Sequence, residues 1–256
     1  MHIVAIGDVV GKLGRRTIAE MLPQIRKEYP VDFVIANGEN AAGGKGLTPS
    51  TADEMFRAGV DVITSGNHIW EHRDIYAMMN EGAPIIRPLN YPEGSPGRGY
   101  VITGGVAVVN AIGRVFMPAD TDCPFRGIDK VLSQLQNQRI VLVDMHGEAT
   151  SEKVAMGWYL AGRVSAVFGS HTHVPTADTR ILPGGTAYVT DLGMTGPRDG
   201  IIGMEREPVL HRFLTQMPAR FSAVEHGPAV INAILIDIDD ETGKATSIQR
   251  IDREME

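Results

Sequence analysis

Five short runs of β-branched and other apolar residues restrict the possible folds of this chain more than any other feature. In the first half of the chain, stretches with a helical spacing of apolar residues separate these runs. Strands that alternate with helices favour a mainly parallel sheet with helices packed against it. Strands are therefore predicted at residues 2–7, 32–37, 61–64, 139–145 and 164–168.

Capping residues, periodicity and turn residues indicate the other elements. Thr48 is predicted to cap a helix that begins at Pro49 and continues to about Ala58, because Thr favours the N-cap and Pro the first helical position. Residues 84–115 are rich in Gly, Pro and β-branched residues, which predicts hairpins or meandering strands. Further helices are predicted at residues 15–28 (with an irregularity at Pro23), after His72, at 128–138 and at 151–161, and further strands at 185–190, 229–238 and 245–251.

These elements predict an α/β fold in which two packed β-sheets are flanked by helices. No linker, internal repeat or low-complexity tract interrupts the sequence. Its length suits one large domain with a generous core better than two enzymatic domains. We therefore expect a single domain over residues 1–256.

Composition and charge limit the partners and the compartment. The formal net charge of −7 argues against a non-specific DNA or RNA binder, which would need a basic excess. The single cysteine, Cys123, excludes an internal disulfide framework and a thiolate-rich zinc site, and it fits a reducing compartment. No stretch approaches the roughly 20 apolar residues of a membrane span, and the N-terminus lacks the pattern of a signal peptide. We expect a cytoplasmic protein without a DNA or membrane partner.

Polar side chains follow all five predicted strands at their carboxyl ends, the edge at which open α/β sheets bind ligands. They are Asp8, Glu39, Asn40, Asn67, His68, His146, His171 and His173. Carboxylate, amide and imidazole groups without sulfur suit Mn, Fe, Zn or Co. Two carboxylates and a bridging hydroxide would leave a pair of divalent ions with a net positive charge, able to hold a phosphodiester anion.

Taken singly, these residues have plainer explanations. Asp8 could cap a helix, and Asn67 could stabilise a turn. His146 could be a buried, hydrogen-bonded histidine, and Asp144 could either support it or only satisfy a backbone donor. The conjunction of all these groups, in order along the chain, favours a metal site.

The ordered motifs GDVVG, GEN, GNH and GSHTH, with a lone histidine after an apolar strand, resemble the calcineurin-like metallophosphoesterases. With TDLGMTGP at residues 190–197, they are most similar to the YmdB-type branch, bacterial enzymes that act on phosphodiesters including 2′,3′-cyclic nucleotides. The resemblance implies a phosphodiesterase with a four-layer α/β/β/α fold. It also implies two divalent or mixed-valence transition-metal ions, Fe or Mn before Zn or Co.

The resemblance further implies a role for each polar residue. Glu39 is the expected bridging carboxylate. His68 is the expected general acid for the leaving group, while a metal-bridging hydroxide attacks phosphorus. Glu71 or Asp74 could orient His68, although this role is disfavoured for both. One ion would take Asp8, Glu39, Asn40 and His173, and the other would take Glu39, Asn67, His146 and His171.

Three departures from the broader superfamily accompany this match and argue against protein-phosphatase activity. A histidine ligand is missing from the first motif, and the amide oxygen of Asn40 could replace it. The departures are Asp8-Val9-Val10 for Asp-x-His, Gly38-Glu39 for Gly-Asp, and Ile69 in place of an acidic residue after GNH.

A second hypothesis is a metal-stabilised regulatory or RNA-binding scaffold with weak residual phosphoesterase activity. The presence of His68 argues against it, because a purely structural metal site has no use for an imidazole that is not a ligand. The expected partners are a small phosphodiester or cyclic nucleotide, with RNA ends as a further candidate and a homo-oligomer as an open alternative.

Overall fold

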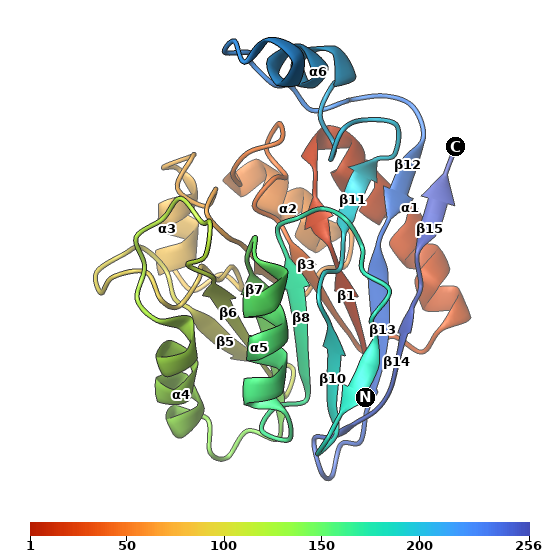
Figure 1. The fold of residues 1–256 in the computed structure, drawn as a ribbon. Coiled ribbons are helices and arrows are strands. Elements are labelled where there is room, and N and C mark those ends of the chain that lie inside the picture. Colours follow the sequence, from red (N-terminus) through yellow and green to blue (C-terminus); the bar gives the residue numbers. More distant parts are fainter.

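The computed structural model describes all 256 residues, and most strands belong to two large sheets packed face to face (Figure 1). The first sheet has the order β14 (Ala245–Arg250), β13 (Ala233–Ile238), β1 (His2–Ile6), β3 (Phe33–Asn37) and β4 (Val62–Thr64). The second has the order β5 (Tyr100–Thr103), β6 (Val106–Ile112), β7 (Ile140–His146), β8 (Ala166–Ser170), β10 (Thr186–Val189) and β9 (Arg180–Leu182). Parallel pairing joins β1, β3 and β4 in one sheet and β6, β7, β8 and β10 in the other.

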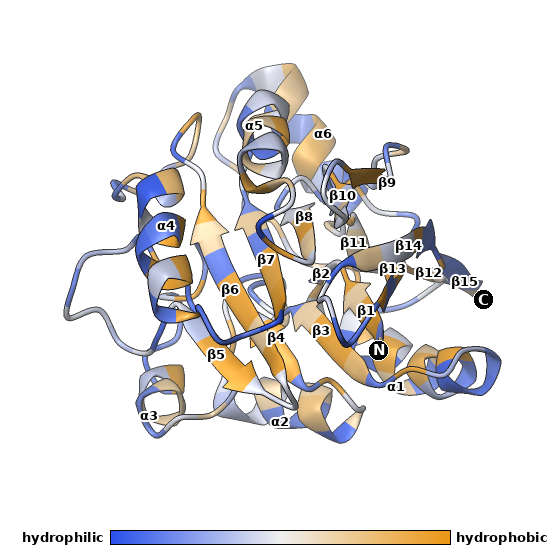
Figure 2. Ribbon diagram, turned by 90° about the horizontal axis from the view of Figure 1, so that it is seen from below, coloured by the Kyte–Doolittle hydropathy of each residue, from blue (hydrophilic) through white to orange (hydrophobic).

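Helices cover the outer face of each sheet. The first sheet carries α1 (Gly11–Glu28), α2 (Pro49–Arg57) and α3 (Ile75–Asn80), and the second carries α4 (Pro124–Gln134) and α5 (Thr150–Leu160). Figure 2 shows the apolar strands enclosed between these helices. The layers are helix, sheet, sheet and helix, which confirms the predicted fold class. No helix has both the length and the apolar character needed to cross a membrane.

The alternation of side chains along each strand produces these layers. On β7, Ile140 and Leu142 belong to the core between the two sheets, together with Ile3 of β1. Val141 and Val143 belong instead to the core between the second sheet and its helices. Asp144 and His146 continue the inward-facing series, so β7 leads directly from the apolar core to the edge of the sheets.

A small third sheet was not predicted. It has the order β15 (Arg253–Met255), β12 (Ala229–Ile231), β11 (Met194–Pro197) and β2 (Asp8–Val9). The prediction of one strand over residues 229–238 was wrong, because the chain changes sheets at Asn232. The carbonyl oxygen of Asn232 accepts a hydrogen bond from Gly7 at 2.9 Å, and its amide donates to Met194 at 3.3 Å.

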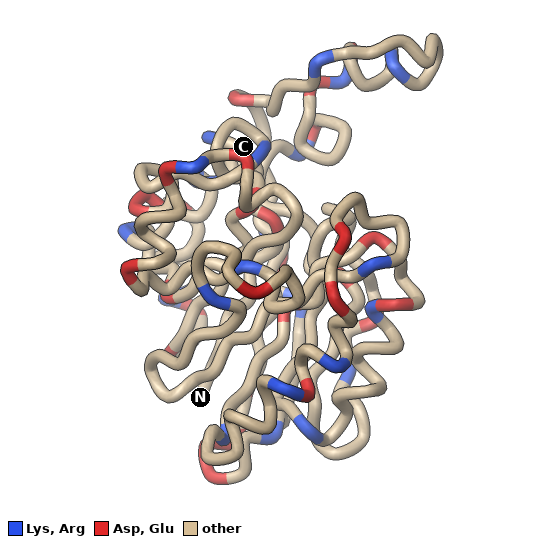
Figure 3. The backbone as a smooth tube through the Cα atoms, turned by 90° about the vertical axis from the view of Figure 1, so that its left-hand side faces the viewer, with Lys and Arg blue, Asp and Glu red and all other residues tan.

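The helix predictions were right in number through residue 161 but not in every boundary. The helix predicted at 128–138 is α4, which begins four residues earlier because Pro124 occupies its first turn. Pro23 does not interrupt α1, where it lies on the exposed side. Thr48 caps α2 and Pro49 begins it, as predicted, and the side chains of Thr48 and Thr51 form a capping box. A sixth helix, α6 (Arg206–Thr215), was missed, and it projects from the body of the molecule (Figure 3).

Candidate active site

The predicted ligands gather where the carboxyl ends of β3, β7 and β8 meet at one edge of the two sheets. Glu39, His146 and His171 offer ligand atoms within 4.8 Å of one another. His146 Nε2 lies 3.1 Å from Glu39 Oε1 and 3.1 Å from His171 Nδ1. The amide oxygen of Asn67 lies 3.2 Å from the same nitrogen. The four residues predicted to hold one ion are therefore direct neighbours.

Two buried oxygen atoms in the predicted site of the other ion have no hydrogen-bond partner. They are Asp8 Oδ1 and Asn40 Oδ1. Asp8 Oδ2 accepts a hydrogen bond from the His171 amide at 3.1 Å, and Asn40 Nδ2 donates to the Gly44 carbonyl at 2.9 Å. Because buried polar atoms are nearly always paired, two unpaired oxygens at one site fit a bound cation. The residues present thus suit a metal with oxygen and nitrogen ligands.

His173 and His68 complete the predicted set. His173 Nδ1 lies 2.9 Å from the Ile202 carbonyl, which leaves Nε2 as the nitrogen available to an ion. The His68 amide donates to Glu39 Oε2 at 3.0 Å, while His68 Nδ1 lies 3.4 Å from Glu71 Oε1. Both rings line a cavity of 290 Å³ together with Glu39, Asn40 and His171. Glu71, one of the two carboxylates considered for orienting His68 and disfavoured for that role, is thus the one that lies beside its ring.

Charge interactions set the protonation of the central pair in the metal-free protein. Burial would raise the pKa of Glu39, but the charge and hydrogen bond of His146 outweigh it and lower the pKa to about 2. Burial would likewise lower the pKa of His146, but Glu39 raises it to about 9. Glu39 is therefore ionised and His146 protonated at neutral pH. A metal ion would take the place of that proton.

Burial and the charge of His146 also shift the pKa values of Asp8 and His171. Burial raises the pKa of Asp8 to about 7, against the opposing effect of His173 and His146. Burial and the positive charge of His146 lower the pKa of His171 to about 3. His171 is consequently neutral at physiological pH, which is the state that a metal ligand requires.

A hydrogen-bond chain beneath the site orients the ring of His146. Ser170 Oγ lies 3.0 Å from His146 Nδ1 and donates to Asp144 Oδ1 at 2.7 Å. Since the hydroxyl proton goes to the carboxylate, Nδ1 must be the donor to Ser170, and Nε2 is directed at the ligand cluster. Asp144 therefore supports His146, and it does so through Ser170 rather than by direct contact.

A buried ion pair supports the loop that carries His171 and His173. Lys153 Nζ lies 2.6 Å from Asp191 Oδ2, and both side chains are at most 2% exposed. Lys153 also donates to the Ser170 carbonyl at 3.3 Å, and Asp191 accepts from Thr172 Oγ1 at 2.8 Å. His171 and His173 have φ values of 100° and 64°, a left-handed conformation that requires such support.

The sequence reasoning did not identify these supporting residues. Ser170 lies within GSHTH and Asp191 within TDLGMTGP, so both motifs had been noted without a role for these side chains. Lys153 carries no signal in the sequence, because a lysine on a helix is normally exposed.

Comparison with known proteins identifies the family. The sequence model of a family described as YmdB-like protein matches residues 4–251. The chain belongs to the YmdB-like family. The chain is 48% identical over 256 residues to the 2′,3′-cyclic-nucleotide 2′-phosphodiesterase of Bacillus subtilis (strain 168), and the match covers 98% of this chain and 96% of that protein.

Solved structures agree with this assignment. A structure described as a novel phosphatase from Mycoplasma pneumoniae matches with a TM-score of 0.93 and 33% identity, covering 99% of this chain and 93% of that one. The 5′-nucleotidase precursor of Thermus thermophilus shares the fold, with a TM-score of 0.55, 13% identity and coverage of 100% of this chain and 54% of that one. This YmdB-like protein is a hydrolase of phosphate esters, and its metallophosphoesterase fold implies divalent metal ions.

Proposed function

We propose that the protein is a dinuclear-metal phosphodiesterase whose substrates are small phosphodiesters, 2′,3′-cyclic nucleotides first among them. The unpartnered oxygens of Asp8 and Asn40 beside the cluster of Glu39, His146 and His171 carry this proposal. The activity in the name of the Bacillus subtilis relative supports the choice of substrate. Donors without sulfur suit Fe, Mn, Zn or Co, and the family resemblance favours Fe or Mn among them.

Seven side chains would hold the two ions. Asp8, Glu39, Asn40 and His173 would hold one ion, and Glu39, Asn67, His146 and His171 would hold the other. When bound, the ions supply an activated water and the positive charge that offsets the phosphate. Glu39 is suited to lie between them because its two oxygens already have different neighbours, His146 Nε2 for Oε1 and the His68 amide for Oε2.

His68 would act as the general acid. Its ring lines the cavity but is not part of the cluster of Glu39, His146 and His171. With Nδ1 next to Glu71, Nε2 is free to donate a proton to the leaving ribose oxygen. An alcohol leaves poorly as an alkoxide, so this proton matters most for natural diesters.

We place the enzyme in the cytoplasm, which the single Cys123 supports. RNA ends are a second candidate substrate, and a homo-oligomer is compatible with the proposal. One domain over residues 1–256 would carry the whole site.

Replacement of His68 tests the mechanism. His68→Ala should keep both metals but lose about 10²- to 10⁴-fold of the turnover of a 2′,3′-cyclic nucleotide, the usual contribution of general acid–base catalysis. The loss should be clearly smaller for bis-p-nitrophenyl phosphate, whose nitrophenolate leaves without a proton. The control is His72→Ala, which removes a ring whose Nε2 lies 3.2 Å from the Lys45 carbonyl.

Three results would contradict the proposal. Equal losses on both substrates would exclude proton donation by His68. Loss of an ion from His68→Ala would make this residue a ligand. Absence of any turnover by metal-loaded wild-type protein would favour the scaffold hypothesis instead.

A further inference from the structure

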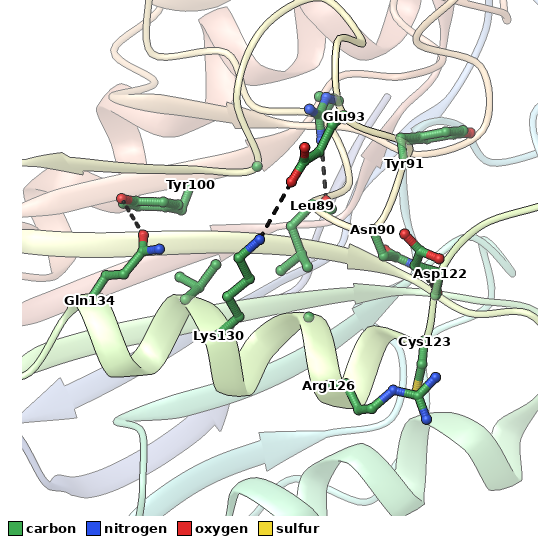
Figure 4. A pocket seen from close by; sticks show the side chains of 14 residues that line it. Leu89, Asn90, Tyr91, Glu93, Tyr100, Asp122, Cys123, Arg126, Lys130 and Gln134 are labelled. Carbon is green, nitrogen blue, oxygen red and sulfur yellow. Dashed lines mark hydrogen bonds and ion pairs between the residues drawn. The ribbon is translucent and has the colours of Figure 1, made fainter.

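A second cavity, of 410 Å³, lies between α4 and the segment that leads into β5 (Figure 4). It shares no lining residue with the cavity of the proposed catalytic site. Its volume is within the range of about 300–1,000 Å³ that is usual for small-molecule sites. The cavity therefore has room for a ligand of its own.

The guanidinium of Arg87 lines this cavity as a buried cation without a carboxylate partner. Arg87 is 8% exposed, and the only hydrogen bonds of its side chain run from Nη1 to the carbonyls of Pro88 at 2.8 Å and Leu89 at 3.3 Å. Its Nε is buried and has no partner. An uncompensated buried charge is costly, so such groups are usually paired or bind a ligand.

The edge of this guanidinium that carries Nε and Nη2 forms no hydrogen bond within the protein. The N–H bonds of Nε and Nη2 point in the same direction, and together they form the fork that binds two oxygens of one phosphate or carboxylate. The backbone carbonyls of Pro88 and Leu89 occupy Nη1 and fix the plane of the group. The protein thus holds the guanidinium rigidly and leaves the fork unused.

Two further cations line the same cavity. Arg126 and Lys130 lie one turn apart on α4, and Arg126 makes no ion pair. Figure 4 shows Lys130 extended towards Glu93, at a distance of 3.5 Å. The two side chains of this pair are 73% and 97% exposed, so the contact is weak and can be exchanged for a better one. With Asp122, the lining carries three cations against two carboxylates.

We propose that this cavity binds a phosphate group, either free or carried by a small phosphorylated molecule. A phosphate carries close to two negative charges at neutral pH and has three or more acceptor oxygens. It can therefore occupy the fork of Arg87, while Arg126 and Lys130, which line the same cavity, add positive charge. A carboxylate brings only one negative charge and two oxygens to the three cations of this lining. The proposal does not depend on the reaction at the metal site.

Calorimetric titration of the metal-loaded protein with inorganic phosphate, and separately with adenosine 5′-monophosphate, tests this site. Two binding events are expected, one at the metals and one at Arg87. In the double variant R126A/K130A, which changes only exposed side chains, one event should weaken at least about tenfold while the metal content stays unchanged. Arg87→Lys keeps the charge but removes the fork, and it should weaken the same event.

The matched control is the double variant K27A/R57A, which removes two cations of α1 and α2 away from the cavity. Crystals grown with phosphate should show the anion against Arg87. Tighter binding of adenosine monophosphate than of phosphate identifies a phosphorylated molecule as the ligand, and equal binding identifies free phosphate. A single binding event in the wild-type protein, or two events unchanged in R126A/K130A, would overturn the proposal.

Discussion

The protonation state of His146 should control the affinity of the proposed site for metal ions. Its Nε2 faces a carboxylate oxygen, an amide oxygen and a second imidazole nitrogen, all within 3.2 Å. In the metal-free protein the negative charge of Glu39 keeps a proton on this ring. An ion bound by His146, as proposed, would therefore compete with this proton for the same nitrogen.

This competition predicts how metal affinity depends on pH. The pKa of His146 is raised to about 9 and that of Asp8 to about 7, so metal binding releases about one proton between these values and about two below pH 7. Affinity should thus rise with pH, about tenfold per unit from pH 7 to 9 and more steeply below pH 7. Competition with a chelator of known affinity measures it. A constant affinity from pH 7 to 9 would contradict the proposed ligand role of His146.

Gly66 is a second residue on which the site depends. A Cβ at this position would overlap the ring of His146 and the Glu39 carboxylate. Gly66→Ala should therefore displace two proposed ligands and lower the metal content and turnover at least about tenfold. Gly147→Ala is the matched control, because a Cβ there meets no atom closer than 3.7 Å. Equal metal content in the two variants would refute the steric argument.

The residue types of the site could be predicted from the sequence, but their orientation could not. The polar residues after five apolar runs indicated Asp8, Glu39 and His146, because a strand end determines where the next side chain emerges. The left-handed backbone at His171 and His173 depends on Lys153 and Asp191, which are distant in sequence. Such long-range support leaves no local pattern.

Among the helices and strands, the boundaries that could be predicted from the sequence are those set by interactions between neighbouring residues. Thr48 and Pro49 marked the beginning of α2, since capping involves only neighbouring residues. The break between β12 and β13 was not visible, because the run around Asn232 is apolar on both sides and only pairing with two different sheets divides it. The short strands of the third sheet were missed for the same reason.

The buried ion pair of Lys153 on α5 with Asp191 should contribute strongly to the stability of the protein. Lys153→Met would leave Asp191 buried and unpaired, which should lower the free energy of unfolding by about 3–5 kcal/mol. Urea denaturation of metal-free protein measures this change. Lys27→Met, at an exposed site on α1, is the control and should alter stability by less than about 0.5 kcal/mol.

A double variant separates the pair from its surroundings. Lys153→Met with Asp191→Asn removes both charges, so it should be less destabilised than the sum of the two single variants. Additive effects would show that the two charges do not stabilise each other. In that case another cause must hold the loop of His171 and His173.

Across the whole molecule, the proposed metal site joins the two sheets. Glu39 follows a strand of the first sheet, whereas His146 and the residues after Ser170 come from the second. The layered fold was predictable because alternation of strands and helices is a pattern of the whole chain. The third sheet forms through pairing between distant segments, which leaves no local pattern. Only Val209 is buried in α6, so this helix lacks the periodic apolar residues that predict a helix.

Removal of the ions should therefore weaken the entire fold. Each ion present at about 100 times its dissociation constant contributes about 2.7 kcal/mol, so two ions contribute about 5 kcal/mol. For a chain of this length that corresponds to a fall in melting temperature of about 10–20 °C when chelation removes both ions. Calorimetry with and without a chelator measures the difference, and restored ions should reverse it. An unchanged melting temperature after verified removal would contradict a site that joins the sheets.

The position of Asp144 between the sheets has a consequence for how they are aligned. Its carboxylate accepts hydrogen bonds from Thr64 at 2.5 Å and Asn37 at 3.4 Å in one sheet and from Ser170 at 2.7 Å in the other. The apolar side chains around it would tolerate many ways of docking two sheets, because hydrophobic contact has no direction. A buried carboxylate tolerates only the docking in which its partners meet it. Asp144 therefore makes misaligned dockings of the two sheets costly. It lies only two residues before His146 on β7, so the alignment that it favours is also the one that brings the proposed ligands together.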